Sequence, residues 1–493
     1  LYQNQVLAFL VDNTVHMTIC NDAYKNVSFY RYRACVYTVT KRNRNNLIHG
    51  GSEIMNEIYR FPLKQHIGNK AVPCVVKGDE IRRGQPLALQ GEGLGSNIFS
   101  SVSGTVVKVD DTEIEVRKER EDDGYVPLSS GDPLALIKES GLVGLGGAGF
   151  PTYAKLAKPF DNGGTVIVNA AECEPILSHN IARIENRPEQ LIRGLEIAMD
   201  VVKADKGIIA IKECHEKAID ILTRYVQESS KNITLHALPD IYPMGEERAV
   251  VREVMGELLP VGALPLEAGA VIINAETTCR IQEIVDMRKP FIDKDMTVGG
   301  KIRGNESEKM IQVFLDVPIG TSVAEMFRKA GGEENDGISE DVGELIMGGP
   351  FTGKRTTLDS VVIKTTGGLI ASECFPKGPA RIGLLVCACG ADEERMRQIA
   401  ESMGSEVAGV QYCKQAMETG NTRKCLNPGK CPGQVQKVML LKKAGADALL
   451  IGNCTDCSNT VMSCAPKLGL AVYHSTDGPL RAVNHKLIRR IKD

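Results

Sequence analysis

The N-terminal half of this chain opens with short apolar runs separated by turns. Between residues 55 and 130, runs rich in valine and isoleucine end or begin at Gly78, Gly84 and Gly104. Strands favour β-branched residues, and glycine marks the turns between them. Residues 55–130 are therefore predicted to form a small β-sandwich.

Longer segments follow in which strand-like runs alternate with helical periods. Within residues 131–295, the runs "GTVIVNAAE", "GIIAIKE" and "AVIINAE" are separated by helical stretches such as "RPEQLIRGLEIAMDVVKA" and "ERAVVREVMG". Residues 296–370 indicate strands around one helix, "SVAEMFRKAGG". Residues 378–493 return to alternation, with strands at "RIGLLVCAC", "EVAGVQYC", "ALLIGNC" and "LAVYHST". The pattern predicts an α/β multidomain fold.

The first 54 residues show neither a sustained helical period nor a strand period. We interpret residues 1–54 as a non-native or disordered extension, with Met55 as the natural start.

Composition narrows the class of protein. A net charge of -3 with scattered Lys and Arg gives no basic face for nucleic acid. The run "VLAFLV" is far shorter than the ~20 residues of a membrane span. We therefore expect a cytoplasmic protein without a transmembrane segment. In that compartment its 15 cysteines are expected to be ligands or redox thiols, and nine of them follow residue 370.

The stretch "GLGGAGFPT" has the G-x-G-x-x-G spacing, at Gly144, Gly146 and Gly149. The segment before it, "DPLALIKESG", indicates a helix, whereas a dinucleotide-binding turn follows a strand. Pro151 suits the first residue of a helix. We expect a glycine loop that opens a helix toward an anion, with Lys155 as countercharge. A tight turn without a ligand is the alternative.

A second glycine-rich stretch, "GGPFTGKRT", matches G-x-x-x-x-G-K. Arg355 stands where a P-loop needs Ser or Thr for magnesium, and the next segment, "LDSVVIK", indicates a strand rather than a helix. We interpret this stretch as a structural turn.

Five cysteines stand at the predicted strand ends of the tail. Cys387 and Cys389 end the first strand, Cys413 the second, and Cys454 with Cys457 the third. The carboxyl ends of parallel strands share one edge of a sheet, so these sulfurs are predicted to converge. An iron-sulfur centre, a redox-active dithiol at "CTDC", and structural zinc are the competing interpretations. Inert buried cysteines fit this placement poorly.

Two further tail cysteines, Cys425 and Cys431, lie on a Gly- and Pro-containing loop that would fold over the same edge. Cys464 is expected inside a helix.

Four motifs in fixed order, "GLGGAGFPTYAK", "NAAECEP", "GEE" and "NAETT", resemble the flavin- and NADH-binding fold of the 51-kilodalton flavoprotein of respiratory complex I. The runs "PLKQHIG", "SVSGTVV" and "IMGGPFTG" extend the resemblance to the RnfC component of the Rnf electron-transport complex, over residues 59–370. The resemblance implies a barrel-sandwich hybrid, an α/β FMN/NADH-binding domain and a β-grasp module of the soluble-ligand-binding (SLBB) type. With its Cys-rich tail, the chain is most similar to the electron-transfer proteins associated with proline reductase.

The resemblance also implies site residues. Glycines of the first motif would border FMN, Lys155 and Asn274 would lie near its phosphate, and acidic residues would meet the nicotinamide and the NADH hydroxyls. The implied cofactor contacts are Gly144, Gly146, Gly147, Gly149, Lys155, Asn169, Glu172, Glu174, Gly245, Glu246, Glu247, Asn274 and Thr277. Transfer between nicotinamide and flavin needs no side-chain acid or base, so we assign no catalytic residue. Leu145 and Ala171 replace an arginine and an aspartate of the complex I flavoproteins.

These features predict an NADH-oxidising flavoprotein that passes electrons through its tail to a protein acceptor. The resemblance implies that D-proline reductase is the acceptor. The first alternative is a peripheral subunit of a membrane Rnf-type ion-pumping complex, although the tail has no ferredoxin-type cysteine run. The second is a non-catalytic adaptor that has lost its flavin. Because electron intake and exit are predicted on different domains, a chain ending at Lys377 is expected to keep flavin reduction.

Overall fold

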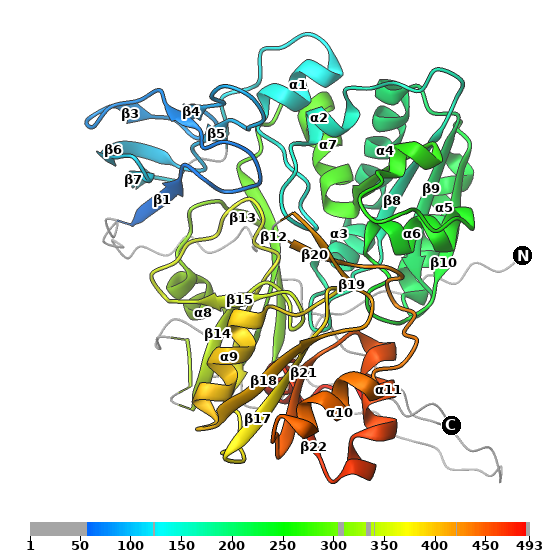
Figure 1. The fold of residues 1–493 in the computed structure, drawn as a ribbon. Coiled ribbons are helices and arrows are strands. Elements are labelled where there is room, and N and C mark those ends of the chain that lie inside the picture. Colours follow the sequence, from blue (N-terminus) through cyan, green and yellow to red (C-terminus); the bar gives the residue numbers. More distant parts are fainter. Residues whose placement is uncertain are drawn as a thin grey trace, which may run out of the picture. The chain divides into compact units, whose positions relative to one another are not determined.

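The computed structural model describes residues 57–121, 124–303, 310–331, 337–339, 341–420 and 422–489 (Figure 1). The predicted extension, residues 1–54, lies outside them. Across the described residues, no helix combines the length and the apolarity that crossing a bilayer requires. The predicted mixed α/β class is confirmed, whereas the limits of the individual domains stay predictions.

The N-terminal part consists of two antiparallel sheets, in the orders β1-β7-β6-β3 and β2-β4-β5. Along β7, Ile114 and Val116 are fully buried while their neighbours are more exposed, as expected for a strand with one face on a core. The predicted β-sandwich is therefore confirmed. Its strands are β1 (Ile58–Pro62), β2 (Val72–Pro73), β3 (Glu80–Ile81), β4 (Pro86–Leu89), β5 (Ile98–Phe99), β6 (Ser103–Val109) and β7 (Glu113–Arg120).

A parallel sheet of order β10-β9-β8-β11 follows, flanked by helices. Asn169 and Asn274 are paired in register at the carboxyl ends of β8 and β11, so both reach one edge of the sheet. The strands are β8 (Thr165–Ala170), β9 (Lys206–Lys212), β10 (Ile233–Leu238) and β11 (Ala270–Asn274). The helices are α1 (Pro133–Glu139), α2 (Thr152–Leu156), α3 (His179–Asn186), α4 (Pro188–Val202), α5 (Glu216–Glu228), α6 (Glu247–Met255), η1 (Pro265–Ala268) and α7 (Ala275–Met287).

The third sheet is mixed, in the order β13-β12-β16-β14-β15, and packs against one helix as predicted. The predicted strand at "LDSVVIK" is wrong, because that segment makes only an isolated bridge between Val361 and Ser322. The elements are β12 (Asp293–Gly300), β13 (Ile311–Pro318), α8 (Val323–Gly331), β14 (Val342–Met347), β15 (Lys354–Thr356) and β16 (Gly368–Glu373).

The tail forms a parallel sheet of order β18-β17-β21-β22, with its strands where the sequence predicts them. A small hairpin, β19 with β20, lies outside this sheet. The strands are β17 (Arg381–Val386), β18 (Glu406–Tyr412), β19 (Ala416–Thr419), β20 (Thr422–Cys425), β21 (Ala448–Gly452) and β22 (Ala471–His474). The helices are α9 (Glu393–Ser402), α10 (Val435–Lys443), α11 (Thr455–Cys464), η2 (Pro466–Leu468) and α12 (Asp477–Arg481).

Buried polar contacts join the tail to the rest of the chain. Arg395 on α9 pairs with Glu344 at 2.8 Å and donates to the Pro350 carbonyl at 2.8 Å. Arg248 on α6 donates to the carbonyls of Cys425 and Leu426 at 2.5 and 2.8 Å. A chain that ended at Lys377 would lose these contacts, although Glu344 would keep its pair with Arg355 at 2.8 Å and Arg248 its bond to the Leu259 carbonyl at 2.9 Å. That such a chain keeps flavin reduction stays a prediction.

Candidate functional site

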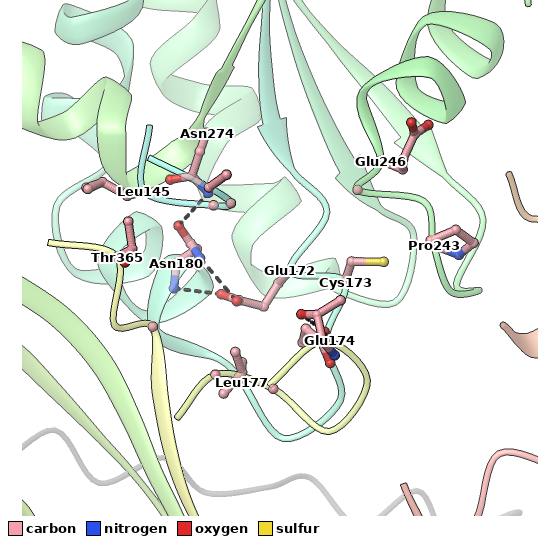
Figure 2. A pocket seen from close by; sticks show the side chains of 18 of the residues that line it. Leu145, Glu172, Cys173, Glu174, Leu177, Asn180, Pro243, Glu246, Asn274 and Thr365 are labelled. Atoms are coloured by element: carbon pink, nitrogen blue, oxygen red, sulfur yellow. Dashed lines mark hydrogen bonds between the residues drawn. The ribbon is translucent and has the colours of Figure 1, made fainter. Parts of the chain in front are cut away.

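A pocket of about 840 Å³ opens at the carboxyl edge of the β8–β11 sheet (Figure 2). Its walls come from the glycine loop, residues 242–246, the turn at residues 347–356 and, from the tail, Cys389. The predicted contacts that line it are Gly146, Gly147, Asn169, Glu172, Glu174, Gly245, Glu246 and Asn274. The predicted contacts outside its lining are Gly144, Gly149, Lys155, Glu247 and Thr277.

The glycine loop presents backbone to the pocket. A Cβ on Gly146 would lie 2.9 Å from Asn274 Nδ2, whereas a Cβ on Gly147 would meet nothing within 4 Å. Among the described residues, no hydrogen bond uses the N–H groups of Gly146, Gly147 or Ala148. The loop therefore offers free N–H donors to an anion, and a side chain at Gly146 would have to displace the Asn274 side chain.

The helix after the loop is short. Pro151 precedes α2 as its cap instead of being its first residue, and the helix has only five residues. A helix of little more than one turn has a weak dipole, so the expected anion site at its N-terminus is not supported. The loop is held instead from the other side, where Leu145 N donates to Thr277 Oγ1 at 3.0 Å.

Lys155 does not face the pocket. Its ammonium group pairs with Glu247 at 2.6 Å and donates to the Ile272 carbonyl at 3.1 Å. The cations of the lining are Lys354 and Arg355, in the second glycine-rich stretch. The interpretation of that stretch as merely a structural turn therefore needs correction, because it forms a wall of the pocket.

Glu172 and Glu174 are both engaged by the protein. Glu172 caps α3 by accepting from Asn180 N at 2.6 Å and from Asn180 Nδ2 at 3.1 Å. Glu174 accepts from the N–H groups of Phe351 and Thr352, each at 2.8 Å, and so fixes the turn. Burial raises the pKa of Glu174, although these hydrogen bonds oppose the shift. The two carboxylates shape the pocket walls.

Asn180 is a pocket residue that the sequence analysis missed. Its side chain joins Glu172 to Asn274, whose Nδ2 donates to Asn180 Oδ1 at 3.3 Å, as Figure 2 shows. The same oxygen accepts from Glu276 N at 3.1 Å. Asn180 therefore ties the starts of α3 and α7 together, a contact that no local pattern indicates.

The other wall is built on Asn169 and Glu246. Asn169 Nδ2 donates to the Gly245 carbonyl at 2.8 Å, which holds the loop before α6. Glu246 caps α6 by accepting from Ala249 N at 2.9 Å, and burial raises the pKa of its carboxyl group. Glu247, by contrast, pairs with Lys155 outside the lining. The two adjacent acidic residues therefore have different environments.

The tail cysteines converge as predicted. The sulfurs of Cys387, Cys454 and Cys457 lie within 4.8 Å of one another, and all three residues are buried. We call these three residues the thiol triad. The backbone N–H of Cys389 donates to Cys387 Sγ at 3.4 Å, Cys389 and Cys413 pack in the same cluster as the triad, and the neighbouring thiols lower the pKa of Cys387. Three buried sulfurs at this spacing fit a shared metal, since thiolates ligate zinc and iron-sulfur clusters. Their role as ligands stays a prediction.

Two aromatic rings separate the pocket from the thiol triad. Tyr242 stacks on Phe351, with ring centroids 3.7 Å apart and planes at 6°. The Tyr242 hydroxyl donates to the Cys389 carbonyl at 2.6 Å, and both rings pack in one buried cluster with the triad. The pocket and the thiols are thus neighbours across one layer of side chains. The sequence analysis missed both rings, because they come from segments far apart in the chain.

Comparison with known proteins places the chain in a family. Residues 137–283 match the Nuo51 FMN-binding domain, and residues 43–123 match the RnfC barrel sandwich hybrid domain. The chain is 30% identical to the C component of the proton-translocating ferredoxin:NAD(+) oxidoreductase complex of Clostridium ljungdahlii, over 63% of this chain and 69% of that one. The chain belongs to the RnfC-like family. This RnfC-like chain is also 33% identical to the cobalamin reductase PduS of Citrobacter freundii, over 71% of this chain and 72% of that one.

Membership in the RnfC-like family confirms the predicted class, an NADH-dependent oxidoreductase of electron transfer with FMN as cofactor. Among solved structures, an NAD+-reducing [NiFe]-hydrogenase in its air-oxidised state is 21% identical, over 48% of this chain and 46% of that one, with a TM-score of 0.40. A similarity of that size supports no structural argument. The pocket suits FMN, because its volume is typical of small-molecule sites and its loop has free N–H donors.

Proposed function

We propose that this chain oxidises NADH at FMN bound in the pocket and passes the electrons through the thiol cluster to D-proline reductase. The observation that carries the proposal is the shared wall, since Cys389 lines the pocket and its backbone N–H donates to Cys387 Sγ in the thiol triad at 3.4 Å. Bound FMN would accept electrons as a pair and would release them one at a time. The protein has to hold it, orient it and exclude water.

Residues from each wall of the pocket have a role in this proposal. The N–H groups of Gly146, Gly147 and Ala148 bind the FMN phosphate, and Lys354 lies on the same lining as a cation. Glu246 orients NADH through the carboxylate that caps α6. The stacked rings of Tyr242 and Phe351 keep water from the space between pocket and thiols.

The identity of the protein acceptor is the most specific part of the proposal. The resemblance that the sequence motifs and the Cys-rich tail bear to proline reductase-associated electron-transfer proteins implies D-proline reductase. A second candidate is a peripheral role in an ion-translocating complex, which the match to a component of such a complex favours. Mixing the NADH-reduced chain with D-proline reductase or with ferredoxin separates them, because only the true acceptor is reduced at a rate that rises with its concentration. Location in the cytoplasm stays a prediction.

The pocket assignment is tested with Gly147→Leu. The new side chain would enter open space in the pocket without a clash, so the fold should remain while the FMN content of the anaerobically purified protein falls at least about tenfold. Gly131→Leu is the matched control, since Gly131 also has nothing within 4 Å of its Cβ position and lies outside the pocket. Equal flavin spectra in both variants would contradict the assignment. A colourless wild type that cannot take up FMN would indicate a non-catalytic adaptor.

A further inference from the structure

The β19–β20 hairpin and α10 belong to a basic segment in a chain whose net charge is -3. Residues 413–446 contain one acidic residue, Glu418, which pairs with Arg423 at 2.7 Å. The basic residues of the segment are Lys414, Arg423, Lys424, Lys430, Lys437, Lys442 and Lys443. The segment therefore has no further carboxylate to offer its exposed lysines, and its surface attracts anionic groups.

Apolar side chains are exposed among these lysines. Met417 is 45% exposed, Leu426 42% and Val435 50%. Met417 lies directly opposite Lys424 in the hairpin. Leu426 N donates to the Gln415 carbonyl at 2.9 Å, next to the same rungs of the hairpin. We call this surface the exit face, and its residues, all exposed, are Lys414, Met417, Lys424, Leu426, Lys430 and Val435.

A buried glutamine joins the exit face to the thiol triad. Gln434 accepts from Lys414 N at 3.2 Å through Oε1. Its Nε2 donates to Cys431 Sγ at 3.2 Å and to Cys457 Sγ of the triad at 3.7 Å. Cys431 is half-buried and follows Lys430 directly in the chain. At this place one side chain lies between the triad and the exit face.

The hairpin covers the thiols with its inner side. Ala416 is paired in register with Cys425, and Ala416 packs on the buried cluster that contains the triad. Cys425 is buried while its neighbour Lys424 is exposed, as the alternation of side chains along a strand requires. The outer side of the hairpin therefore faces solvent where its inner side packs on the thiols.

We propose that the exit face docks the protein acceptor, through a patch of that protein with an apolar centre and an acidic rim. This rests on the proposed function, in which electrons leave the chain through the thiols. Exposed apolar side chains framed by charges are typical of protein interfaces, and electron-transfer partners meet through small ones, below about 1,200 Å². An anionic membrane would attract the same lysines, but the position of the face directly over the thiols favours an electron acceptor.

The test measures binding of the full-length oxidised chain to D-proline reductase and to ferredoxin, by surface plasmon resonance without NADH. Lys414→Glu, Lys424→Glu and Lys430→Glu are combined in one variant. The contacts of Gln434 and Gln415 use backbone atoms of Lys414 and Lys430, so the fold should remain, which circular dichroism checks. At low salt the association rate constant for the acceptor should fall at least about tenfold, because opposite charges on two partners speed their encounter.

The matched control combines Lys77→Glu, Lys158→Glu and Lys467→Glu, since these lysines are exposed and lie outside the exit face. Its association rate constant should stay within about twofold of the wild-type value. Equal slowing in both variants would overturn the proposal, and so would a wild type that binds neither acceptor.

Phosphatidylglycerol vesicles test the membrane alternative. If the variant of the exit face lost vesicle binding and kept acceptor binding, the face would belong to a membrane contact and the proposal would be overturned. Charge-dependent acceptor binding by a chain whose flavin NADH does not reduce would keep the exit face and contradict the proposed NADH oxidation instead.

Discussion

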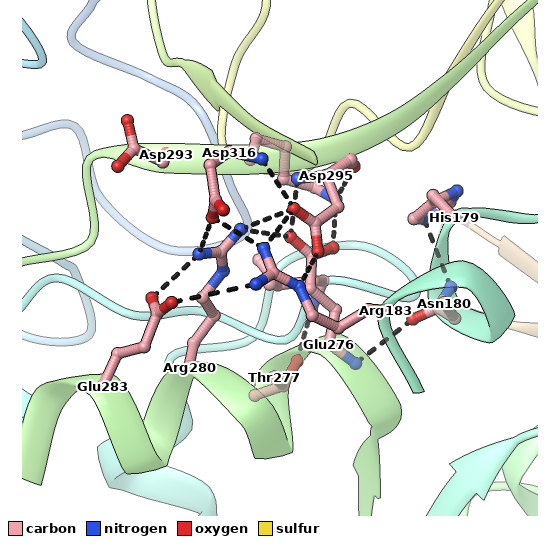
Figure 3. Close-up of polar contacts among 12 residues, drawn as sticks. His179, Asn180, Arg183, Glu276, Thr277, Arg280, Glu283, Asp293, Asp295 and Asp316 are labelled. Carbon is pink, nitrogen blue, oxygen red and sulfur yellow. Dashed lines mark hydrogen bonds and ion pairs between the residues drawn. The ribbon is translucent and has the colours of Figure 1, made fainter. Parts of the chain in front are cut away.

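Two buried polar regions lie one layer of residues from the pocket, and their polar groups find partners in different ways. Among α3, α7 and β12, Arg183 and Arg280 converge on Asp295, as Figure 3 shows. Arg183 grips Asp295 with two hydrogen bonds, at 2.7 and 2.6 Å, and both guanidinium groups also reach Asp316. Lys294 pairs with Glu276 in the same network. Every charge named has an opposite charge as partner.

The thiol triad and the cysteines around it have no such pairing of opposite charges. Their buried sulfurs pack with Tyr242 and Phe351, and thiols are weak hydrogen-bond donors and acceptors. In the charge network, burial raises the pKa of Asp295, but the two guanidinium groups outweigh burial and hold this pKa below its ordinary range. Buried charges that are paired by opposite charges support the fold, whereas buried thiols that gather without an opposite charge suit a ligand or redox chemistry. The comparison therefore assigns structure to one region and chemistry to the other.

The largest effect should follow from breaking the charge network. Asp295→Ala leaves two buried guanidinium groups without their shared carboxylate, which should lower the free energy of unfolding by about 3–5 kcal/mol. Urea unfolding followed by circular dichroism measures this change. Asp286→Ala is the control, because its pair with Arg193 is partly exposed and contributes less than about 1 kcal/mol. Similar losses in both variants would mean that the network is not a structural support.

A smaller and different effect is expected in the thiol triad. Cys454→Ser should lower metal content or metal affinity by more than about tenfold, because it removes one of three converging sulfurs. Without metal, the variant should unfold at nearly the same urea concentration as metal-free wild type, since the triad holds no charge network together. Metal analysis and urea unfolding together check this prediction. Strong destabilisation of the metal-free variant would mean that the thiol triad supports the fold as the charge network does.

The sequence predicts the two regions unequally. The tail strands and the cysteines after them follow a local pattern, and parallel topology alone brings Cys387, Cys413 and Cys454 to one edge. The charge network escapes such reasoning, because Arg183 and Asp295 lie on α3 and β12 and only the packed fold brings them together. What a local pattern encodes is predictable, and what depends on the packing of distant segments is not.

The same limit explains the corrections at the pocket. Lys155 follows the glycine loop closely, which suggested a countercharge, but its ammonium group finds Glu247 from another segment. The turn that contains Lys354 looked structural because its motif fails as a P-loop, yet the fold brings it to the pocket. The sequence analysis also did not name β10, α3 and α7, although Asn274 caps α7 through its side chain, a signal that the sequence carries.

The smallest expected effect concerns Glu246 and Glu247. These residues are adjacent in the chain, but Glu246 lines the pocket and Glu247 forms an ion pair with Lys155. In Glu246→Gln the amide oxygen still accepts from Ala249 N, so the α6 cap remains while the charge in the pocket is lost. Flavin reduction by NADH should slow by about threefold to tenfold, in line with about 1 kcal/mol for one hydrogen bond to a charged group replaced by a neutral one. Glu247→Gln should change this rate less than about twofold, because it weakens only a half-exposed ion pair with Lys155. Stopped-flow reduction by NADH measures both variants, and reduction by dithionite should be the same in both and in the wild type. Equal slowing by the two substitutions would mean that negative charge near α6, and not the place of Glu246 in the pocket wall, governs NADH binding.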